Sequence, residues 1–282
     1  MSIDSTWLRC PNCFSDLSPV GDRVFGCDHG HRFDRSKYGF LTLLPPKAPR
    51  TVGDDRDMLA ARAALLGSGA YAPIADEVVR SIASCVARSD GERLRVADLG
   101  CGTGYYAERV AAATGDVDLL LADRSPDAVR AALRALPEST GVVLDIWRPL
   151  PLRDAGADVI LDIFAPRNPG EFARVLRTHG TLVVVVPRAT HLAELRAAGM
   201  LLDIPPEKSV TVSEQLAVAG IERRTARSVE YTLSADRATR ALLAGMGPSA
   251  HHATSPADDH AEAVEVTVSV DVLTFGHAGS AG

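Results

Sequence analysis

Apolar runs alternate with amphipathic segments through the middle of the chain. The run Leu182–Val186 contains no polar residue, and near-continuous apolar strands of this kind are typical of a parallel sheet covered on both faces. This order indicates a doubly wound α/β domain with its ligand site at the carboxyl ends of the first strands. We predict strands over 94–99, 118–122, 141–145, 157–164 and 181–186, and helices over 103–113, 126–136 and 169–176.

The segments before this region have a different pattern. The stretch 33–44 alternates like a short strand with a glycine bend, and the proline-rich run 45–50 is typical of an extended linker. Helical periodicity then covers 54–66 and 71–86, with Pro73 in the first turn of the second helix.

After the core strands, the pattern predicts a helix over 190–198. Two β-rich segments follow, at 221–233 and 264–275, with a helix over 235–244 between them. The stretch 248–260 is polar and is predicted to be a loop.

A glycine-rich turn follows the first predicted strand and contains the most informative residues. Asp98 stands two positions before Gly100, and Gly102, Thr103 and Gly104 lead into the helix; Asp123 ends the next strand. Glycine lets the backbone approach a ligand closely. The spacing indicates a nucleotide-type site.

Two ligands compete for this site. A dinucleotide prefers G-x-G-x-x-G, and Gly102, Gly104 and Ala107 form a permitted variant of it. A carboxylate at Asp98, however, repels the pyrophosphate that a helix N-terminus attracts. S-adenosylmethionine has no phosphate and brings a cationic amino group and a sulfonium. We therefore expect S-adenosylmethionine, with Asp98 facing its positive charge and Asp123 accepting from the ribose hydroxyls.

Four residues near the N-terminus have the spacing of a metal site. Cys10 and Cys13 form C-x2-C, and Cys27 and His31 form C-x3-H, which matches a closed tetrahedral zinc site. A segment this short buries little apolar surface, so a metal supplies its missing stability. A redox pair at Cys10 and Cys13 requires a thioredoxin-like context, which is absent. His29 lies only two residues from Cys27 and is expected at the rim.

Composition excludes some classes of protein. The net charge of −6 argues against a general polycation, although it permits a local basic face. The first residues have no signal-peptide pattern, and no apolar run approaches the ~20 residues that span a bilayer. We therefore expect a cytoplasmic protein without a membrane partner, whose cysteines are thiols or metal ligands.

The combination of these motifs resembles a known family. The glycine-rich turn and the strands after it are similar to class I S-adenosylmethionine-dependent methyltransferases. With the zinc knuckle, the chain resembles the 23S rRNA guanine-N1 methyltransferases, including the actinomycete branch that confers resistance to macrolides such as tylosin. The resemblance rests on four segments that span most of the chain: 10–34, 58–71, 164–169 and 187–195.

The resemblance implies a fold class and three parts. The fold is α/β, with a Rossmann-like, mostly parallel sheet, helices on both faces and a small N-terminal zinc-binding domain. The expected parts are a zinc-knuckle domain at 1–45, a linker and helical segment at 46–93, and an S-adenosylmethionine-binding methyltransferase domain at 94–282.

The resemblance also implies site residues. The zinc ligands are Cys10, Cys13, Cys27 and His31. Tyr71 and His191 contact the cofactor, and Asp145 accepts from the adenine amine. The full set expected to bind S-adenosylmethionine is Tyr71, Asp98, Gly100, Gly102, Thr103, Asp123, Asp145, Ile146 and His191.

The implied acceptor is N1 of a guanine in a 23S rRNA hairpin that lines the peptide exit tunnel. N1 lies on the Watson–Crick edge, so the base has to be unpaired before it is methylated. N1 also carries a proton, so the site has to remove that proton or stabilise the negative charge that develops on O6. Three residues at the end of the fourth core strand or just after it are candidates: Arg167 for O6 or phosphate, Asn168 for the base edge, and Asp162 for a proton relay.

Three further points bear on the acceptor. Arg32, Arg35, Lys37, Lys47 and Arg50 are expected to form a basic surface for RNA, or else a solvated face. The family implies a homodimer. Ala70 and His251 stand where we expect histidine and tryptophan in close relatives. A changed acceptor pocket would suit the alternative function, which is methylation of a small biosynthetic intermediate. A third hypothesis is a module that senses the cofactor without catalysis.

Overall fold

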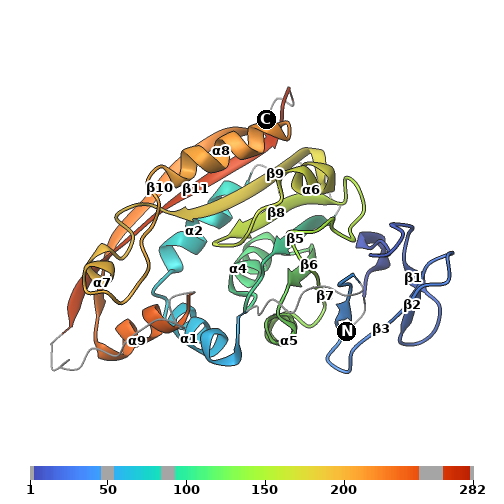
Figure 1. Cartoon of the computed structure of the whole chain (residues 1–282), viewed down its shortest axis with the longest axis horizontal. Coiled ribbons are helices and arrows are strands. Elements are labelled where there is room, and N and C mark those ends of the chain that lie inside the picture. The colour runs from blue at the N-terminus through green and yellow to red at the C-terminus, as the bar shows by residue number, and fades with distance from the viewer. Residues whose placement is uncertain (1–2, 46–53, 84–92, 248–262, 280–282) are drawn as a thin grey trace.

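The centre of the molecule is an eight-stranded, mostly parallel sheet (Figure 1). The computed structural model describes residues 3–45, 54–83, 93–247 and 263–279. The strand order is β10-β11-β9-β8-β5-β6-β7-β4, and among the described strands of this sheet β11 alone is reversed, running antiparallel to its two neighbours β10 and β9. The strands are β4 Leu41–Thr42, β5 Leu94–Leu99, β6 Val117–Asp123, β7 Thr140–Val143, β8 Ala157–Ile163, β9 Leu176–Pro187, β10 Ile221–Ala235 and β11 Val264–His277.

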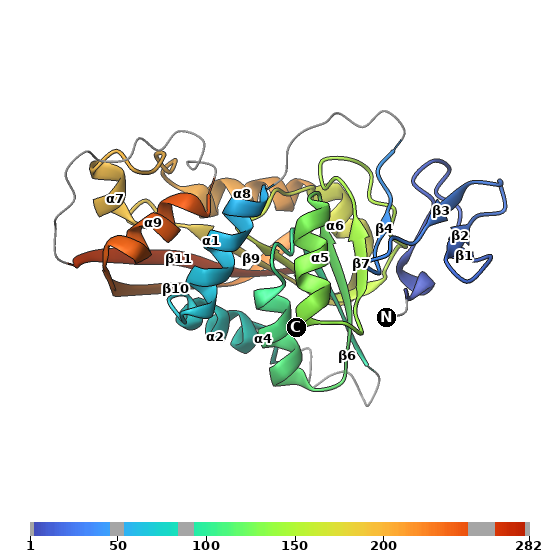
Figure 2. The same cartoon turned by 90° about the horizontal axis from the view of Figure 1, so that it is seen from below.

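Helices cover both faces of this sheet, as predicted (Figures 1 and 2). Alternate residues of each strand point to opposite faces, so Val96 packs on the first face and Ala97 on the second. The first face is covered by α1 Arg56–Gly67, α2 Ala72–Ser81, α4 Tyr105–Thr114, α5 Pro126–Ala135, α7 Ala193–Ala197 and α9 Arg237–Gly245. The second face is covered by α6 Pro169–Val175, α8 Lys208–Val218 and the N-terminal unit.

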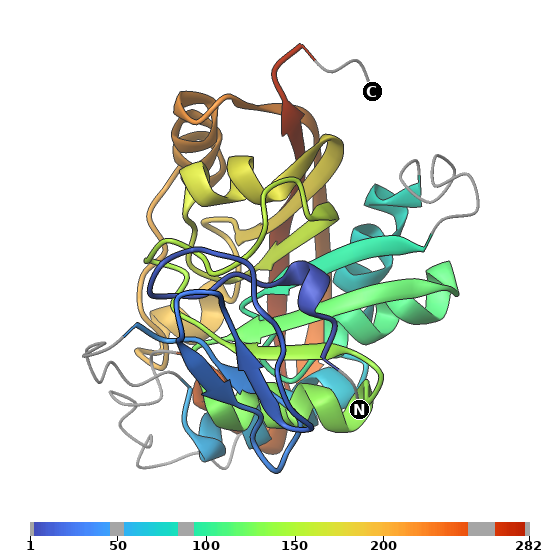
Figure 3. The same cartoon turned by 90° about the vertical axis from the view of Figure 1, so that its right-hand side faces the viewer.

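The N-terminal unit is a small ribbon that packs on the second face (Figure 3). It consists of a 3-10 turn η1 Ser5–Trp7 and an antiparallel sheet of β1 Ser18–Pro19, β2 Val24–Gly26 and β3 Arg32–Asp34. Trp7 is buried, with the Arg95 guanidinium 4.0 Å above its ring, and Leu8 pairs with Leu152. These contacts hold the ribbon firmly against the larger sheet.

The stretch 33–44 differs from its prediction. It is two strands in two sheets: β3 ends the ribbon, while β4 pairs in parallel with β7 at the edge of the main sheet. The chain turns at Ser36–Gly39, where Gly39 has a φ of 101°, a value that favours glycine. The ribbon and the main sheet are therefore joined through this segment.

Most other predicted elements are confirmed, although β9 begins at Leu176, five residues before its predicted start. The Ser125 hydroxyl caps α5 as expected, accepting from the Ala128 amide at 3.4 Å. Helix α8 was not predicted, and α7 is shorter than the predicted 190–198. The predicted polar loop, Lys47, Arg50 and His251 lie outside the described residues. Within the described ranges no helix is both long and apolar enough to cross a bilayer.

Candidate active site and metal centre

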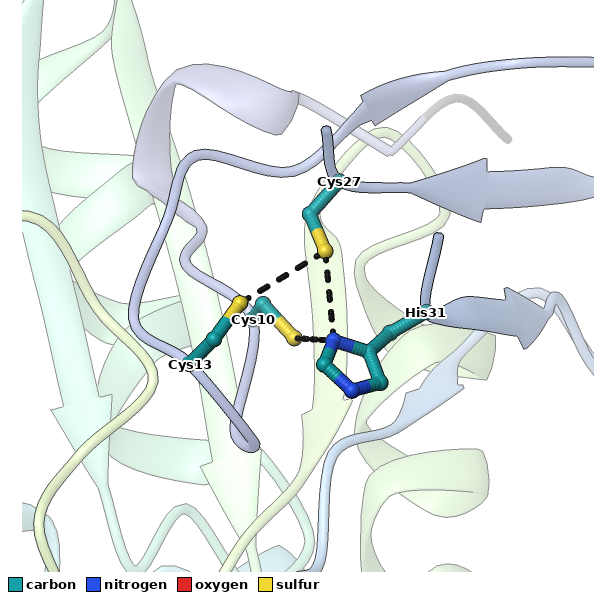
Figure 4. A group of neighbouring side chains, drawn as sticks. All are labelled: Cys10, Cys13, Cys27 and His31. Carbon is teal, nitrogen blue, oxygen red and sulfur yellow. Dashed lines mark hydrogen bonds between the residues drawn. The ribbon is translucent and has the colours of Figure 1, made fainter. Parts of the chain in front are cut away.

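The structure brings Cys10, Cys13, Cys27 and His31 together in the ribbon (Figure 4). Their ligand atoms all lie within 4.8 Å of one another. The Nδ1 atom of His31 is 3.5 Å from Sγ of Cys10 and 3.4 Å from Sγ of Cys27, and the Cys13 and Cys27 sulfurs are 3.6 Å apart.

These distances fit zinc. Tetrahedral bonds of about 2.3 Å to sulfur and about 2.0–2.1 Å to nitrogen place neighbouring ligand atoms roughly 3.5–3.8 Å apart. His29 is not in the cluster; its ring contacts the Ser15 hydroxyl at 3.1 Å. Three thiolates and one imidazole close the coordination sphere, so the arrangement is typical of a structural site rather than a catalytic one.

A cavity of about 820 Å³ opens at the carboxyl ends of β5, β6 and β8. All the residues predicted to bind the cofactor line it: Tyr71, Asp98, Gly100, Gly102, Thr103, Asp123, Asp145, Ile146 and His191. The structure thus collects the predicted cofactor residues in one place, and their contact with S-adenosylmethionine stays a prediction.

The glycine turn is shaped by close contacts on both sides. Gly100 has a φ of 94°, and a Cβ there would lie 2.5 Å from the Cβ of Ala165. Gly104 has a φ of 84°, and a Cβ there would lie 2.9 Å from the Cβ of Ala132. Both positions therefore require glycine for conformation and for space.

Two carboxylates line the cavity beside this turn, the buried Asp98 and the half-buried Asp123. Asp98 is 3% exposed, and burial together with the charge of Asp123 raises its pKa to about 7. Burial also raises the pKa of Asp123, although its oxygens accept from the amides of Gly102 at 3.0 Å and Ser125 at 2.8 Å. A buried acid of this kind gains most from a cationic ligand, which restores its charged form.

Tyr71 and His191 form a pair at the other wall of the cavity. The Nδ1 atom of His191 accepts from the Ser269 amide at 3.2 Å, and burial lowers the His191 pKa to about 4. The ring is therefore neutral with its proton on Nε2, which donates to the Tyr71 hydroxyl at 3.4 Å. The Tyr71 hydroxyl keeps its own proton for an acceptor in the cavity, such as a ligand carboxylate.

The loop after β7 contains Asp145 and Ile146, which line the cavity and are predicted to contact the adenine. Arg124 makes an ion pair with Asp145. The Asn168 amide nitrogen donates to the carbonyls of Ile146 at 2.9 Å and Arg148 at 3.1 Å. Both amide hydrogens of Asn168 are thereby used within the protein, so this side chain holds the loop in place.

The predicted catalytic residues lie behind the cavity wall. Asp162 is fully buried, with Oδ2 3.3 Å from Arg167, and burial raises its pKa to about 8 even though Arg167 opposes the shift. Asp162, Arg167 and Asn168 are missing from the described residues that line the cavity, whereas Lys208, at the start of α8, is present. A direct role for the three in catalysis stays a prediction.

Two features of the cavity were not predicted. Phe164 is 41% exposed with a φ of 54°, a strained value for a bulky residue, and its ring centroid lies 6.3 Å from those of Tyr71 and His191. Arg62 of α1 lies over the turn, where it pairs with Asp54 and donates to the Met246 carbonyl at 2.7 Å. Neither feature has a local sequence signal, because each depends on contacts between distant segments.

Comparison with known families identifies both parts of the chain. A profile described as "Methyltransferase domain" matches residues 96–180, and a zinc-ribbon profile described as "RlmA, N-terminal" matches residues 8–51. The solved structure of YcgJ from Bacillus subtilis superposes with a TM-score of 0.50, at 14% identity, over 71% of this chain and 99% of that one. The fold is that of a class I methyltransferase with an added zinc ribbon.

Curated relatives align over nearly the whole chain. A 23S rRNA (guanine(748)-N(1))-methyltransferase from Streptomyces fradiae is 41% identical and covers 87% of this chain and 86% of its own. A putative 23S rRNA (guanine-N(1)-)-methyltransferase from Micromonospora griseorubida is 38% identical, covering 89% and 88%. These matches make S-adenosylmethionine and Zn²⁺ the cofactors. The chain belongs to the 23S rRNA (guanine-N1)-methyltransferase family.

Proposed function

We propose that this protein transfers a methyl group from S-adenosylmethionine to N1 of a guanine in a 23S rRNA hairpin near the peptide exit tunnel. The observation that carries the proposal is the set of residues that line this cavity. Its lining includes two carboxylates at the ends of β5 and β6, Asp98 and Asp123, and also the exposed ring of Phe164 after β8 and the cation Lys208 at the start of α8. A cationic donor fits the first pair, which we call the donor end, and an acceptor base with an anionic oxygen fits the second pair, which we call the acceptor end.

The donor end has a partner for each polar part of S-adenosylmethionine. Asp98 faces the amino group, Tyr71 donates to the carboxylate, and Asp123 accepts from the ribose hydroxyls with the lone pairs left over from its two amide contacts. Asp145 and Ile146 border the adenine. Bound there, S-adenosylmethionine supplies an electrophilic methyl group on a positively charged sulfur.

The acceptor end suits a base that is unpaired or flipped out of an RNA helix. Guanine N1 is inaccessible in a paired duplex, so the base has to be flipped out or unpaired. The exposed ring of Phe164 offers a stacking surface at the cavity wall, and stacking on an aromatic ring stabilises an unpaired base by about 1–3 kcal/mol. We assign Arg167, Asp162 and Asn168 to positioning this wall, because they support it from behind.

The ribbon is the proposed RNA contact. Arg32 and Lys37 are exposed on it, and Lys37 lies 5.0 Å from the ring of Tyr38. Exposed cations such as Arg32 and Lys37 attract the phosphate backbone of RNA electrostatically, without regard to its sequence. We further propose that the enzyme works in the cytoplasm as a homodimer that frames the RNA, and that methylation confers macrolide resistance. Light scattering of the purified protein tests the dimer, and inhibitory macrolide concentrations with and without the gene test resistance.

Primer extension across the exit-tunnel hairpin tests the proposed activity. Methylation of N1 blocks Watson–Crick pairing, so reverse transcriptase stops at the modified guanine. We expect a stop in 23S rRNA from cells that carry the gene and no stop in cells that carry an Asp98→Asn variant. Absence of a stop, together with methyl transfer to a metabolite, would instead support the alternative of a small-molecule methyltransferase.

A further inference from the structure

The cavity lining includes a cation, Lys208, to which the proposed function gives no specific contact with the acceptor. Lys208 is the first residue of α8, which packs against α6 and β9 (Figure 1). Its side chain is half-buried and lines the cavity. The residue before it, Glu207, has a φ of 59°, so the backbone enters the helix through a strained conformation at this point.

Lys208 belongs to a small group of charges with Arg167 and Asp162. Arg167 and Asp162 are ion-paired in the layer behind, and both act electrostatically on Lys208. Burial and the charge of Arg167 lower the Lys208 pKa, while Asp162 opposes this shift. The group therefore has two cations and at most one negative charge. Asp203 also lines the cavity but is exposed to solvent, which screens its charge.

A positive group of this kind favours an anionic oxygen in the cavity. Guanine forms such an oxygen only when N1 loses its proton, because the charge then spreads onto O6. Adenine has an amino group at that position, which a cation repels. A group that stabilises developing negative charge in a site shielded from water commonly increases the rate constant 10²–10³-fold.

We infer that Lys208 is the catalytic residue that binds O6 of the acceptor guanine and stabilises the base in its N1-deprotonated form. As the base docks, its N1 proton passes to solvent water. The N1 electron pair then forms the bond to the methyl carbon, while the bond from that carbon to sulfur breaks and leaves its electron pair on sulfur. Arg167 and Asp162 position Lys208 from behind. This inference rests on the proposed guanine-N1 activity.

The test compares the wild-type protein with Lys208→Met, which removes the charge, and Lys208→Arg, which keeps it. Single-turnover methyl transfer is measured on a transcribed exit-tunnel hairpin at saturating enzyme, together with the dissociation constants for the hairpin and for S-adenosylmethionine. We expect Lys208→Met to slow methyl transfer about 10²–10³-fold with cofactor affinity unchanged. Lys208→Arg should recover at least tenfold of that loss. Lys208→Gln repeats the test if the methionine variant fails to fold.

The pH profile separates this role from a structural one. Loss of the cation should raise the apparent pKa of N1 in the bound complex, so the rate of Lys208→Met should continue to rise at pH values where the wild type has levelled off. Arg167 and Asp162, which act electrostatically on Lys208, the adjacent Glu207, and Asp203 in the cavity lining are unchanged in the variant.

Three results would overturn the inference. An unchanged single-turnover rate in Lys208→Met would exclude a role in the chemistry. Weaker hairpin binding with a smaller salt dependence and an unchanged maximal rate would show that Lys208 contacts a phosphate. A charge-retaining Lys208→Arg variant that is as slow as Lys208→Met would point to a proton acceptor. Failure of the proposed function is distinguishable, because the wild-type protein would then also leave the hairpin unmethylated.

Discussion

Binding of S-adenosylmethionine should be coupled to ionisation of Asp98. In the free protein, burial and the neighbouring Asp123 raise the Asp98 pKa from 3.8 to about 7. The ligand's cationic amino group pairs with the carboxylate and not with the neutral acid, so binding draws Asp98 into its charged form. Affinity is therefore highest at pH values well above 7 and is lost as the pH falls through 7.

The size of the effect follows from the fraction of ionised Asp98. With a pKa of about 7, roughly three quarters of the molecules are ionised at pH 7.5 and about 3% at pH 5.5. The dissociation constant should thus rise roughly 25-fold between these two values. Ionisation of Asp123, whose pKa is also raised, would add to this change in the same direction.

Isothermal titration calorimetry measures this coupling directly. S-adenosylhomocysteine carries the same amino group and does not turn over, so it serves as the ligand. Titration at pH 6 in buffers of different ionisation enthalpy should show release of roughly 0.9 proton per ligand bound. In the control variant Asp98→Asn, affinity at pH 7.5 should fall about 10–100-fold, since a charged hydrogen bond is lost, and the release of protons should largely vanish.

The reasoning would be refuted by either of two results. A dissociation constant that stays constant from pH 5.5 to 7.5 would mean that Asp98 is already ionised in the free protein or does not face the ligand. An Asp98→Asn variant with the same pH dependence as the wild type would assign the coupling to another group.

Three further predictions concern the ribbon, the turn and the loop. Cys27→Ser should abolish stoichiometric zinc, measured by mass spectrometry, and lower Tm, because metal stabilises the ribbon. Gly100→Ala should weaken cofactor binding and lower the free energy of unfolding by about 1–3 kcal/mol, because Gly100 has a positive φ and a Cβ there would contact Ala165. In the control Gly170→Ala, where the added Cβ meets open space, the free energy of unfolding should rise by about 0.5–1 kcal/mol. Asn168→Ala should raise the cofactor dissociation constant severalfold, because the loop carbonyls of Ile146 and Arg148 lose their hydrogen bonds to Asn168. An unchanged affinity would show that Asn168 does not hold this loop in place.

Local sequence patterns were sufficient to predict many of the strands, the cofactor and the metal cluster of this protein. The apolar runs predicted the parallel strands, because strands buried on both faces tolerate few polar residues. The charge argument at Asp98 predicted S-adenosylmethionine over a dinucleotide, because a carboxylate beside a helix N-terminus repels a pyrophosphate. The spacing of Cys10, Cys13, Cys27 and His31 predicted the cluster that the structure forms.

Features that depend on distant contacts could not be predicted. Helix α8 contains Val210, Thr211 and Val212, whose β-branched side chains lower helix propensity; packing of its buried face on the sheet overrides that preference. The pairing of β4 with β7 joins residues about 100 positions apart and has no local signal. Lys208 was also missing from the predicted site, because only the fold brings it to the cavity.

The nucleoside products of a purified reaction test the central claim most directly. Zinc-loaded protein is incubated with S-adenosylmethionine and a transcribed exit-tunnel hairpin, and the digested RNA is analysed by mass spectrometry. The account predicts 1-methylguanosine at up to one per hairpin, with none when the target guanine is replaced by adenine. A hairpin that stays unmethylated, or one methylated on another base or another guanine atom, would contradict it.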